Sequence, residues 1–216
     1  LSFFDKYVGK NLLEISKLLD DEIFDAISHN KGMVGQIFEG LTGRKPNTYS
    51  EPDIKELNID LKVLPLKKVN NILVSKERSK LTSANYKKIL NDDWNDTYLR
   101  KKIDKILFNA YYHPSGSSYD NLEDFIFKGA FIFHLDERIE KDTIKSDWLR
   151  LKKKVCQFKA HSISEKMFRL LSASTSGTGR LQKYHRDAKL AKERSHSFKN
   201  GYLTSLWKEQ SHPYLP

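Results

Sequence analysis

The sequence predicts a mixed α/β domain in which helices flank a central sheet, and three kinds of stretch indicate this class. Apolar and polar residues alternate over residues 57–63, as they do in a half-buried strand. Residues 103–112 and 125–135 are apolar runs, and the Phe and Ile of the second favour a strand. Residues 9–19 and 21–28 space their apolar side chains as amphipathic helices do. A chain of 216 residues can bury one sizeable core.

The remaining elements follow from periodicity and turn chemistry. A helix is predicted from about Lys31 to Leu41. Residues 69–74 are predicted to form a second strand, antiparallel to the first, because only a short turn containing Lys67 and Lys68 separates them. For residues 125–135 a buried helix stays open as the alternative to a strand. Further helices are expected over residues 86–90, after Trp94, over residues 136–156 and over residues 198–207.

Two aspartates and a lysine at the first strand suggest metal-dependent hydrolysis of a phosphodiester. Side chains two apart in a strand share a face, so Lys62 is expected beside Asp60, and Asp53 can reach the same face from the preceding loop. The two carboxylates and the Leu61 carbonyl are oxygen ligands that suit Mg²⁺. Lys62 could then orient the attacking water and help to deprotonate it. Such a triplet also arises by chance on the wet face of a sheet, and the pattern alone favours that interpretation.

Longer blocks of sequence resemble the MutH and Sau-three-AI family, whose members are GATC-specific endonucleases of the PD-(D/E)xK fold. The blocks are residues 30–40, 52–65, 99–103 and 197–206. The resemblance implies a restriction-endonuclease-like α/β fold with two lobes around a DNA cleft, and Mg²⁺-dependent cutting of double-stranded DNA at or beside GATC. Residues 57–80 and 198–206 look closer to the restriction branch, whose enzymes have a second, catalytically silent half of similar fold. The chain could therefore be a catalytic half, and it begins with leucine rather than methionine, as an excised domain would.

The resemblance also assigns roles to two further residues. Glu39 would reach the metal cleft, directly or through water; without the family, an exposed helical glutamate is an equal alternative. Lys102 would lie near the scissile phosphate, where composition alone suggests only a solvated basic run. The family usually has glutamate at the position of Asp60, and the shorter aspartate would draw the metal toward the backbone or loosen its coordination. This departure keeps a silent DNA-binding module open, beside a mismatch-repair nickase of hemimethylated GATC.

Basic residues are concentrated in the C-terminal part of a chain whose net charge is +10. Residues 150–208 contain 15 Lys or Arg and three acids, a net charge of +12, so the remainder carries −2. This asymmetry favours a polyanion such as DNA as the partner, and a membrane surface is weaker because no strongly amphipathic helix with an aromatic face stands out. The prediction is a single nuclease domain over residues 1–216, with sub-lobes of about 1–150 for the catalytic sheet and 150–216 for DNA binding.

The candidate DNA-contacting residues lie in this basic part. Residues 172–180 are predicted to form a flexible, hydroxyl-rich loop, which composition alone would make a linker. The resemblance implies that this loop enters the DNA and reads bases, a task that suits small donors near an arginine. Cations that follow it should meet phosphates, so that affinity falls with salt. The predicted DNA contacts are Ser172, Ser174, Thr175, Arg180, Arg186, Lys189, Arg194 and Lys199.

Several other classes of function lack support in the sequence. The single cysteine, Cys156, allows no intrachain disulfide, and residues 1–6 become charged too early for a signal peptide. With no apolar run of about 18 residues, a cytoplasmic protein is expected. The seven histidines show no zinc-ligand spacing, and no Gly-Lys-Ser phosphate loop is present. The expected partner is double-stranded DNA, with a dimer on DNA or a second domain of similar fold also possible.

Overall fold

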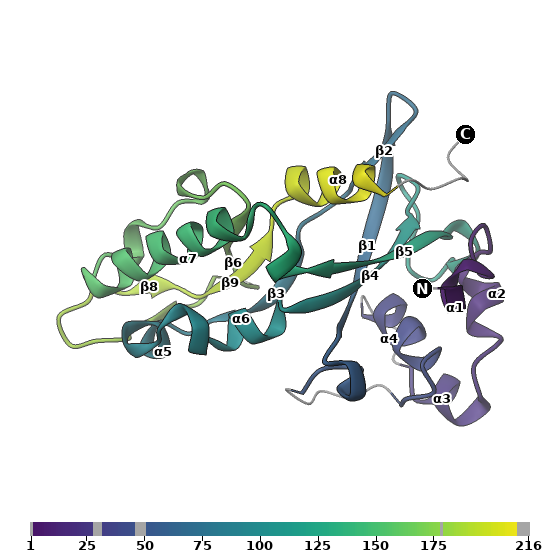
Figure 1. Ribbon diagram of the computed structural model, residues 1–216, viewed down its shortest axis with the longest axis horizontal. Helices are drawn as coiled ribbons and strands as arrows, with labels where there is room; N and C mark the ends of the chain where they lie inside the picture. Colours follow the sequence, from purple (N-terminus) through teal and green to yellow (C-terminus); the bar gives the residue numbers. More distant parts are fainter. Residues whose placement is uncertain (1, 28–31, 46–50, 178, 211–216) are drawn as a thin grey trace. The chain divides into compact units, whose positions relative to one another are not determined.

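Two sheets organise the two compact units into which the chain divides (Figure 1). The computed structural model describes residues 2–27, 32–45, 51–177 and 179–210. The first unit consists of residues 1–77, 105–133 and 204–216, and the second of residues 78–104 and 134–203. Each unit is therefore assembled from separated segments, and no single cut of the chain divides them. That residues 1–216 act as one nuclease domain remains a prediction.

The first unit contains a four-stranded sheet in the order β2-β1-β4-β5, with β1 Asp60–Val69, β2 Ile72–Ser75, β4 Lys105–Tyr112 and β5 Ile126–His134. Strands β1 and β4 run parallel, in a register that pairs Asp60 with Ile106. Strand β1 pairs antiparallel with β2, so the sheet is mixed. The prediction that residues 103–112 form a strand beside the first one is confirmed. Residues 126–134 form a strand rather than the alternative helix, and this strand continues through Lys128 and Gly129.

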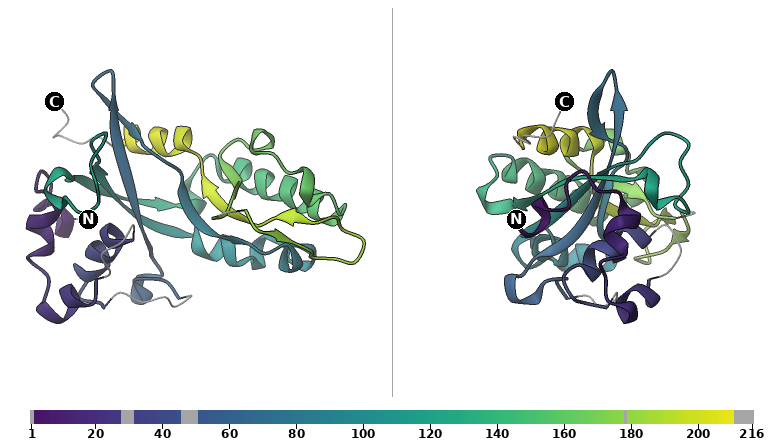
Figure 2. Two further views of the ribbon diagram at one scale, coloured as in Figure 1. Left: turned by 180° about the vertical axis from the view of Figure 1, so that it is seen from behind. Right: turned by 90° about the vertical axis from the view of Figure 1, so that its right-hand side faces the viewer.

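The turn between β1 and β2 consists of Asn70 and Asn71 (Figure 2). Both have positive φ angles, 49° and 62°, as the central residues of a type I′ hairpin turn require. The antiparallel hairpin is confirmed, but the prediction that Lys67 and Lys68 form its turn is wrong, because both lie in β1. Asparagine tolerates the left-handed region better than lysine does, so the strand extends to Val69 before it reverses.

The start of β1 also differs from the sequence prediction. Residues Lys55–Leu57 form a 3₁₀ helix, and Asn58 adopts a left-handed conformation with φ 52°. This turn brings Ile59 back to Ile54, with which it exchanges two backbone hydrogen bonds. The strand therefore begins at Asp60 rather than at Leu57, whose side chain is 58% exposed. The alternation that indicated a strand over residues 57–59 arises from a turn.

Short helices cover the first unit's sheet, and they are shorter than periodicity predicts: α1 Ser2–Asp5, α2 Leu12–Ser16, α3 Asp21–Asp25 and α4 Met33–Gly40. An Asn11 and Glu14 capping box starts α2. Helix α4 packs on the sheet, where the rings of Phe38 and Phe127 lie 5.2 Å apart within one buried cluster. At Gly40 a Cβ atom would lie 2.8 Å from the Ile23 side chain, so only glycine permits the close approach of α4 to α3.

The second unit contains a three-stranded antiparallel sheet in the order β3-β9-β6, with β3 Ser79–Ala84, β9 Arg194–Phe198 and β6 Leu171–Thr175. A small two-stranded sheet joins β7 Leu181–Gln182 to β8 Ala191–Lys192. The helices are α5 Tyr86–Asn91, α6 Tyr98–Lys102, α7 Lys141–Cys156 and α8 Asn200–Glu209, and the last residues of α8 belong to the first unit. Further 3₁₀ turns of this unit are Trp94–Asp96, Leu135–Glu137, Ala160–Ser162 and Glu165–Met167, and the first unit contains another at Leu122–Asp124.

Two sequence predictions for this unit need correction. The long helix begins at Lys141 rather than at residue 136, because a 3₁₀ turn occupies residues 135–137. The stretch 172–180 is not wholly a loop, because residues 171–175 form β6 and pair with β9. Small residues such as Ser172 and Ala173 fit the crowded interior of this sheet, where both are 1% exposed. Among the described residues, none of the helices has the length and hydropathy of a bilayer-crossing segment.

Candidate active site

The structure brings Asp53, Asp60 and Lys62 together at the start of β1. The Asp53 carboxylate accepts a hydrogen bond of 2.7 Å from the Leu61 backbone N–H, which fixes the loop before the 3₁₀ turn against the strand. Asp60, the first residue of β1, is 3% exposed. The Lys62 ammonium donates to Asp60 Oδ2 at 2.6 Å and to the Leu61 carbonyl at 3.0 Å. These are the three groups that the sequence pattern singled out.

Glu39 joins this cluster from helix α4. Burial, the Asp53 charge and the Asp60 charge raise the pKa of Glu39 to about 7, against the opposing influence of Lys62. Because charges act on a half-buried carboxyl group only over short distances, this perturbation indicates that all four side chains share one environment. The helix reaches this position because α4 packs on the sheet through buried residues such as Ile37 and Phe38.

The side chains of this cluster suit a hard divalent cation. Three carboxylates share this environment with one ammonium group, so negative charge is in excess, and the charges of Asp53 and Asp60 add to burial in raising the pKa of Glu39. Carboxylate and carbonyl oxygens are the ligands that Mg²⁺ and similar ions take. Asp53, Asp60 and the Leu61 carbonyl could hold such an ion, provided that Lys62 moves away from Asp60 and Leu61. The donor set therefore fits a metal.

Lys102, the second residue to which the resemblance assigned a catalytic role, lies in the second unit. Lys102 is the last residue of α6, and its ammonium lies 5.8 Å from the centre of the Tyr98 ring. Its role near the scissile phosphate stays a prediction.

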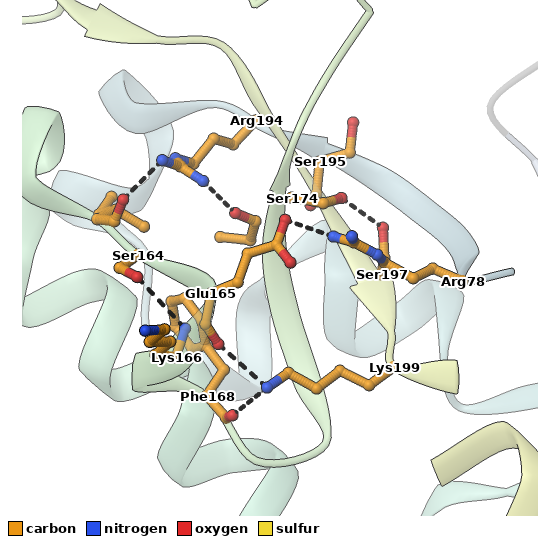
Figure 3. A network of polar contacts seen from close by, with 12 residues as sticks. Arg78, Ser164, Glu165, Lys166, Phe168, Ser174, Arg194, Ser195, Ser197 and Lys199 are labelled. Carbon is orange, nitrogen blue, oxygen red and sulfur yellow. Dashed lines mark hydrogen bonds and ion pairs between the residues drawn. The ribbon is translucent and has the colours of Figure 1, made fainter. Parts of the chain in front are cut away.

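The predicted DNA-contacting residues of the second unit range from exposed to buried, and Ser174, Arg194 and Lys199 are half-buried. Thr175, Arg180, Arg186 and Lys189 are exposed. Ser172, in contrast, is buried in β6. The Ser174 hydroxyl forms a hydrogen bond of 2.9 Å with the Ser197 hydroxyl of the neighbouring strand (Figure 3).

Arg194 and Lys199 already bind backbone carbonyls. The guanidinium of Arg194 donates to the carbonyls of Ala173 and Ile163, at 2.6 Å each. The ammonium of Lys199 donates to the carbonyls of Glu165 and Phe168 (Figure 3). These bonds tie β9 and the residue after it to the neighbouring segments. A phosphate contact by either cation, as the sequence predicts, would have to use its remaining N–H groups or open these bonds.

The basic excess belongs to the second unit as a whole. Its segments contain 24 Lys or Arg and 12 Asp or Glu, a net charge of +12, whereas those of the first unit contain 14 and 16, a net charge of −2. Residues 78–104 contribute to this excess together with residues 150–203. The carboxylate cluster therefore lies in the unit of negative net charge. The positive charge that favours a polyanion lies in the other unit.

Sequence reasoning missed Asp147, a carboxylate in helix α7 that is fully buried. It accepts hydrogen bonds of 2.7 to 3.0 Å from the backbone N–H groups of Arg169, Leu170 and Leu171. It also forms an ion pair with Arg150 at 3.2 Å. Asp147 thereby fixes the start of β6. The available signal was its position on the apolar face of the helix, next to Trp148.

A second acidic group could also hold a metal ion. One ligand atom each from Asp104, His134 and Asp136 lies within 4.8 Å of the others. The guanidinium of Arg100 bridges the two aspartates at 2.8 Å each, and His134 pairs with Glu137 at 2.6 Å. An arginine therefore already supplies positive charge here. Sequence spacing could not reveal this group, because about thirty residues separate Asp104 from the other two.

Comparisons with known proteins agree on one family. A family model described as "DNA mismatch repair enzyme MutH" matches residues 42–147, a stretch that includes Asp53, Asp60 and Lys62. The type II restriction enzyme Sau3AI of Staphylococcus aureus is 33% identical over 205 residues, which are 92% of this chain and 40% of that protein. The DNA mismatch repair protein MutH of Buchnera aphidicola subsp. Baizongia pistaciae is 29% identical over 141 residues, 65% of this chain and 61% of that protein. The chain thus spans less than two thirds of either relative. With its restriction-endonuclease-like mixed α/β fold, the chain belongs to the MutH/Sau3AI family.

Proposed function

We propose that this chain is a Mg²⁺-dependent endonuclease domain that cuts both strands of DNA at GATC, as part of a type II restriction enzyme. The observation that carries the proposal is the convergence of Glu39, Asp53, Asp60 and Lys62 at the start of β1. Three carboxylates and one amine in a partly buried site are the functional groups that metal-assisted hydrolysis of a phosphodiester needs.

Each residue of the cluster has a distinct task in this proposal. Asp53 and Asp60, with the Leu61 carbonyl, would hold the ion, and the hydrogen bond from Leu61 N–H pre-orients Asp53. When bound, Mg²⁺ supplies positive charge that offsets the charge developing on the phosphate. The Lys62 ammonium, already beside Asp60, would orient the attacking water. Glu39 has a pKa of about 7 and can therefore take up or release a proton near neutral pH.

The charge distribution supports DNA as the substrate. The second unit carries +12, and its exposed Arg180, Arg186 and Lys189 have the chemistry to contact phosphates. One comparison favours restriction over repair. The match to a restriction enzyme covers 92% of this chain, while the match to a mismatch repair protein covers 65%. The GATC site itself comes from the family resemblance.

Plasmids of defined methylation state test the reaction. We expect Mg²⁺-dependent double-strand cuts in unmethylated plasmid at GATC, and none in a plasmid that lacks this site. Nicks confined to hemimethylated GATC would instead identify a repair nickase. Binding of GATC duplex without cutting would identify a silent module, for which aspartate at position 60 is the main argument.

Substitutions at the cluster test the assigned residues. Asp53→Asn and Lys62→Met should each lower the cutting rate at least about a hundredfold, because each removes a group from the hydrolytic site. DNA binding, measured without metal, should stay close to that of the unchanged protein. Lys67→Met is the matched control, because Lys67 is an exposed lysine of the same strand. Unimpaired cutting by Asp53→Asn or Lys62→Met would refute the proposed site.

A further inference from the structure

A cavity of about 530 Å³ lies in the first unit, at the hairpin end of β1. Its lining includes Lys68, Ile72, Leu73, Lys128, Trp207 and Lys208, which come from the β1–β2 hairpin, β5 and the end of α8. Asp60 and Lys68 are eight residues apart on the strand. At about 3.3 Å per residue, about 26 Å separates them. The cavity is therefore distinct from the carboxylate cluster.

Three ammonium groups surround this cavity, although the unit as a whole has a net charge of −2. The Lys68 ammonium lies 5.7 Å from the centre of the Tyr112 ring. Lys128 and Lys208 form no hydrogen bond or ion pair with any other residue that the structure describes. Burial, and then the charge of Lys68, lower the pKa of Lys128. Cations held together without a carboxylate among them favour an anionic ligand.

Apart from Asn71, apolar side chains make up the rest of the cavity's lining. Leu73 and Trp207 are buried in its wall. Ile72 is 52% exposed at its edge, and its cross-strand partner Val69 is 46% exposed. A ligand that filled this cavity would therefore cover exposed hydrophobic surface in addition to meeting positive charge.

We propose that this cavity binds an acidic peptide segment of a partner protein, with an aliphatic side chain inside it and a neighbouring carboxylate between Lys68, Lys128 and Lys208. This occupant matches both chemistries of the lining. A DNA phosphate would satisfy the lysines but would leave the exposed side chain of Ile72, and that of Val69 beside it, without an apolar partner. The basic unit, which carries +12, is the better surface for DNA.

Titrations followed by NMR test the proposal on the full chain. The probe is an eight-residue peptide of alternating leucine and glutamate, capped at both ends, and its control replaces each glutamate by glutamine. A second probe is a short DNA duplex without GATC. The signals to follow are the indole N–H of Trp207 and the backbone N–H groups of Ile72 and Leu73.

We expect the acidic peptide to shift these signals in a saturable way and the glutamine peptide to bind at least about fivefold more weakly. Lys128→Gln and Lys208→Gln should each weaken the acidic peptide about fivefold. Lys17→Gln, at an exposed lysine of the same unit outside the cavity, should leave binding unchanged. If a lysine variant fails to fold, Ile72→Ser at an exposed position replaces it and should also weaken binding.

Three results would overturn the proposal. The first is that the peptide leaves these signals unmoved. The second is that the duplex shifts them and the peptide does not, which would make the cavity a nucleic-acid site. The third is equal binding of the acidic and glutamine peptides, which would remove the role of the lysines. None of these results depends on cutting activity, so each is separable from failure of the proposed endonuclease function.

Discussion

The pKa of Glu39 leads to a prediction about stability that needs neither DNA nor metal. Burial and the charges of Asp53 and Asp60 disfavour the ionised carboxyl group in the folded protein and raise its pKa from 4.5 to about 7. Between these two pH values the folded state holds a proton that the unfolded state has lost. Stability from this group is therefore complete at low pH, and it is lost as pH rises from about 4.5 to about 7.

The size of the effect follows from the shift. A change from 4.5 to about 7 corresponds to about 3 kcal/mol in free energy. Because the side chain is only half-buried, water screens part of this energy, and about 2 kcal/mol is the expected penalty above neutral pH. Glu39→Gln keeps the shape of the side chain and cannot ionise. Relative to the unchanged protein, its free energy of unfolding should therefore rise by about 2 kcal/mol between about pH 5 and about pH 8.

Urea unfolding in the presence of a chelator measures this difference. Both proteins are unfolded at about pH 5 and at about pH 8, so that the titration of all other groups cancels between them. Glu123→Gln is the matched control, because Glu123 is an exposed glutamate outside the cluster, and its variant should show no such change. A difference between Glu39→Gln and the unchanged protein that stays constant with pH would refute the inference that the carboxylates share one environment.

Three further predictions follow from other contacts. Asp147→Asn should destabilise the protein by about 3 kcal/mol, measured by urea unfolding, because a neutral amide lacks the negative charge with which three backbone N–H groups and an arginine interact. The control Asp142→Asn, on the exposed face of α7, should cost little. Mg²⁺ should raise the midpoint of thermal unfolding, by a margin equivalent to about 2.7 kcal/mol at a hundredfold excess over Kd, and Asp53→Asn should remove most of this gain. Arg186→Gln should reduce the slope of log affinity for DNA against log salt by about 1, and an unchanged slope would argue against a phosphate contact by this residue.

The local chemistry of the sequence was enough to predict several elements. The short connection after the first strand predicted the β1–β2 hairpin, and apolar runs predicted β4 and β5. Residues two apart in a strand lie on one face, so the contact between Asp60 and Lys62 was also predictable. The local pattern failed to predict the structure where a single residue adopts an unusual backbone conformation. The left-handed Asn58 ends a turn that periodicity alone presents as part of the strand.

The sequence by itself determined the mixed α/β class, the candidate triplet of Asp53, Asp60 and Lys62, and the clustering of basic residues, because these depend on spacing and composition. The tertiary structure alone decided which distant residues meet. The raised pKa of Glu39 exists because helix α4 packs against β1, and the buried Asp147 and the half-buried Arg194 both bind backbone groups of distant segments. The physical reason is that burial and hydrogen-bond partners depend on neighbours far along the chain, which no local pattern specifies.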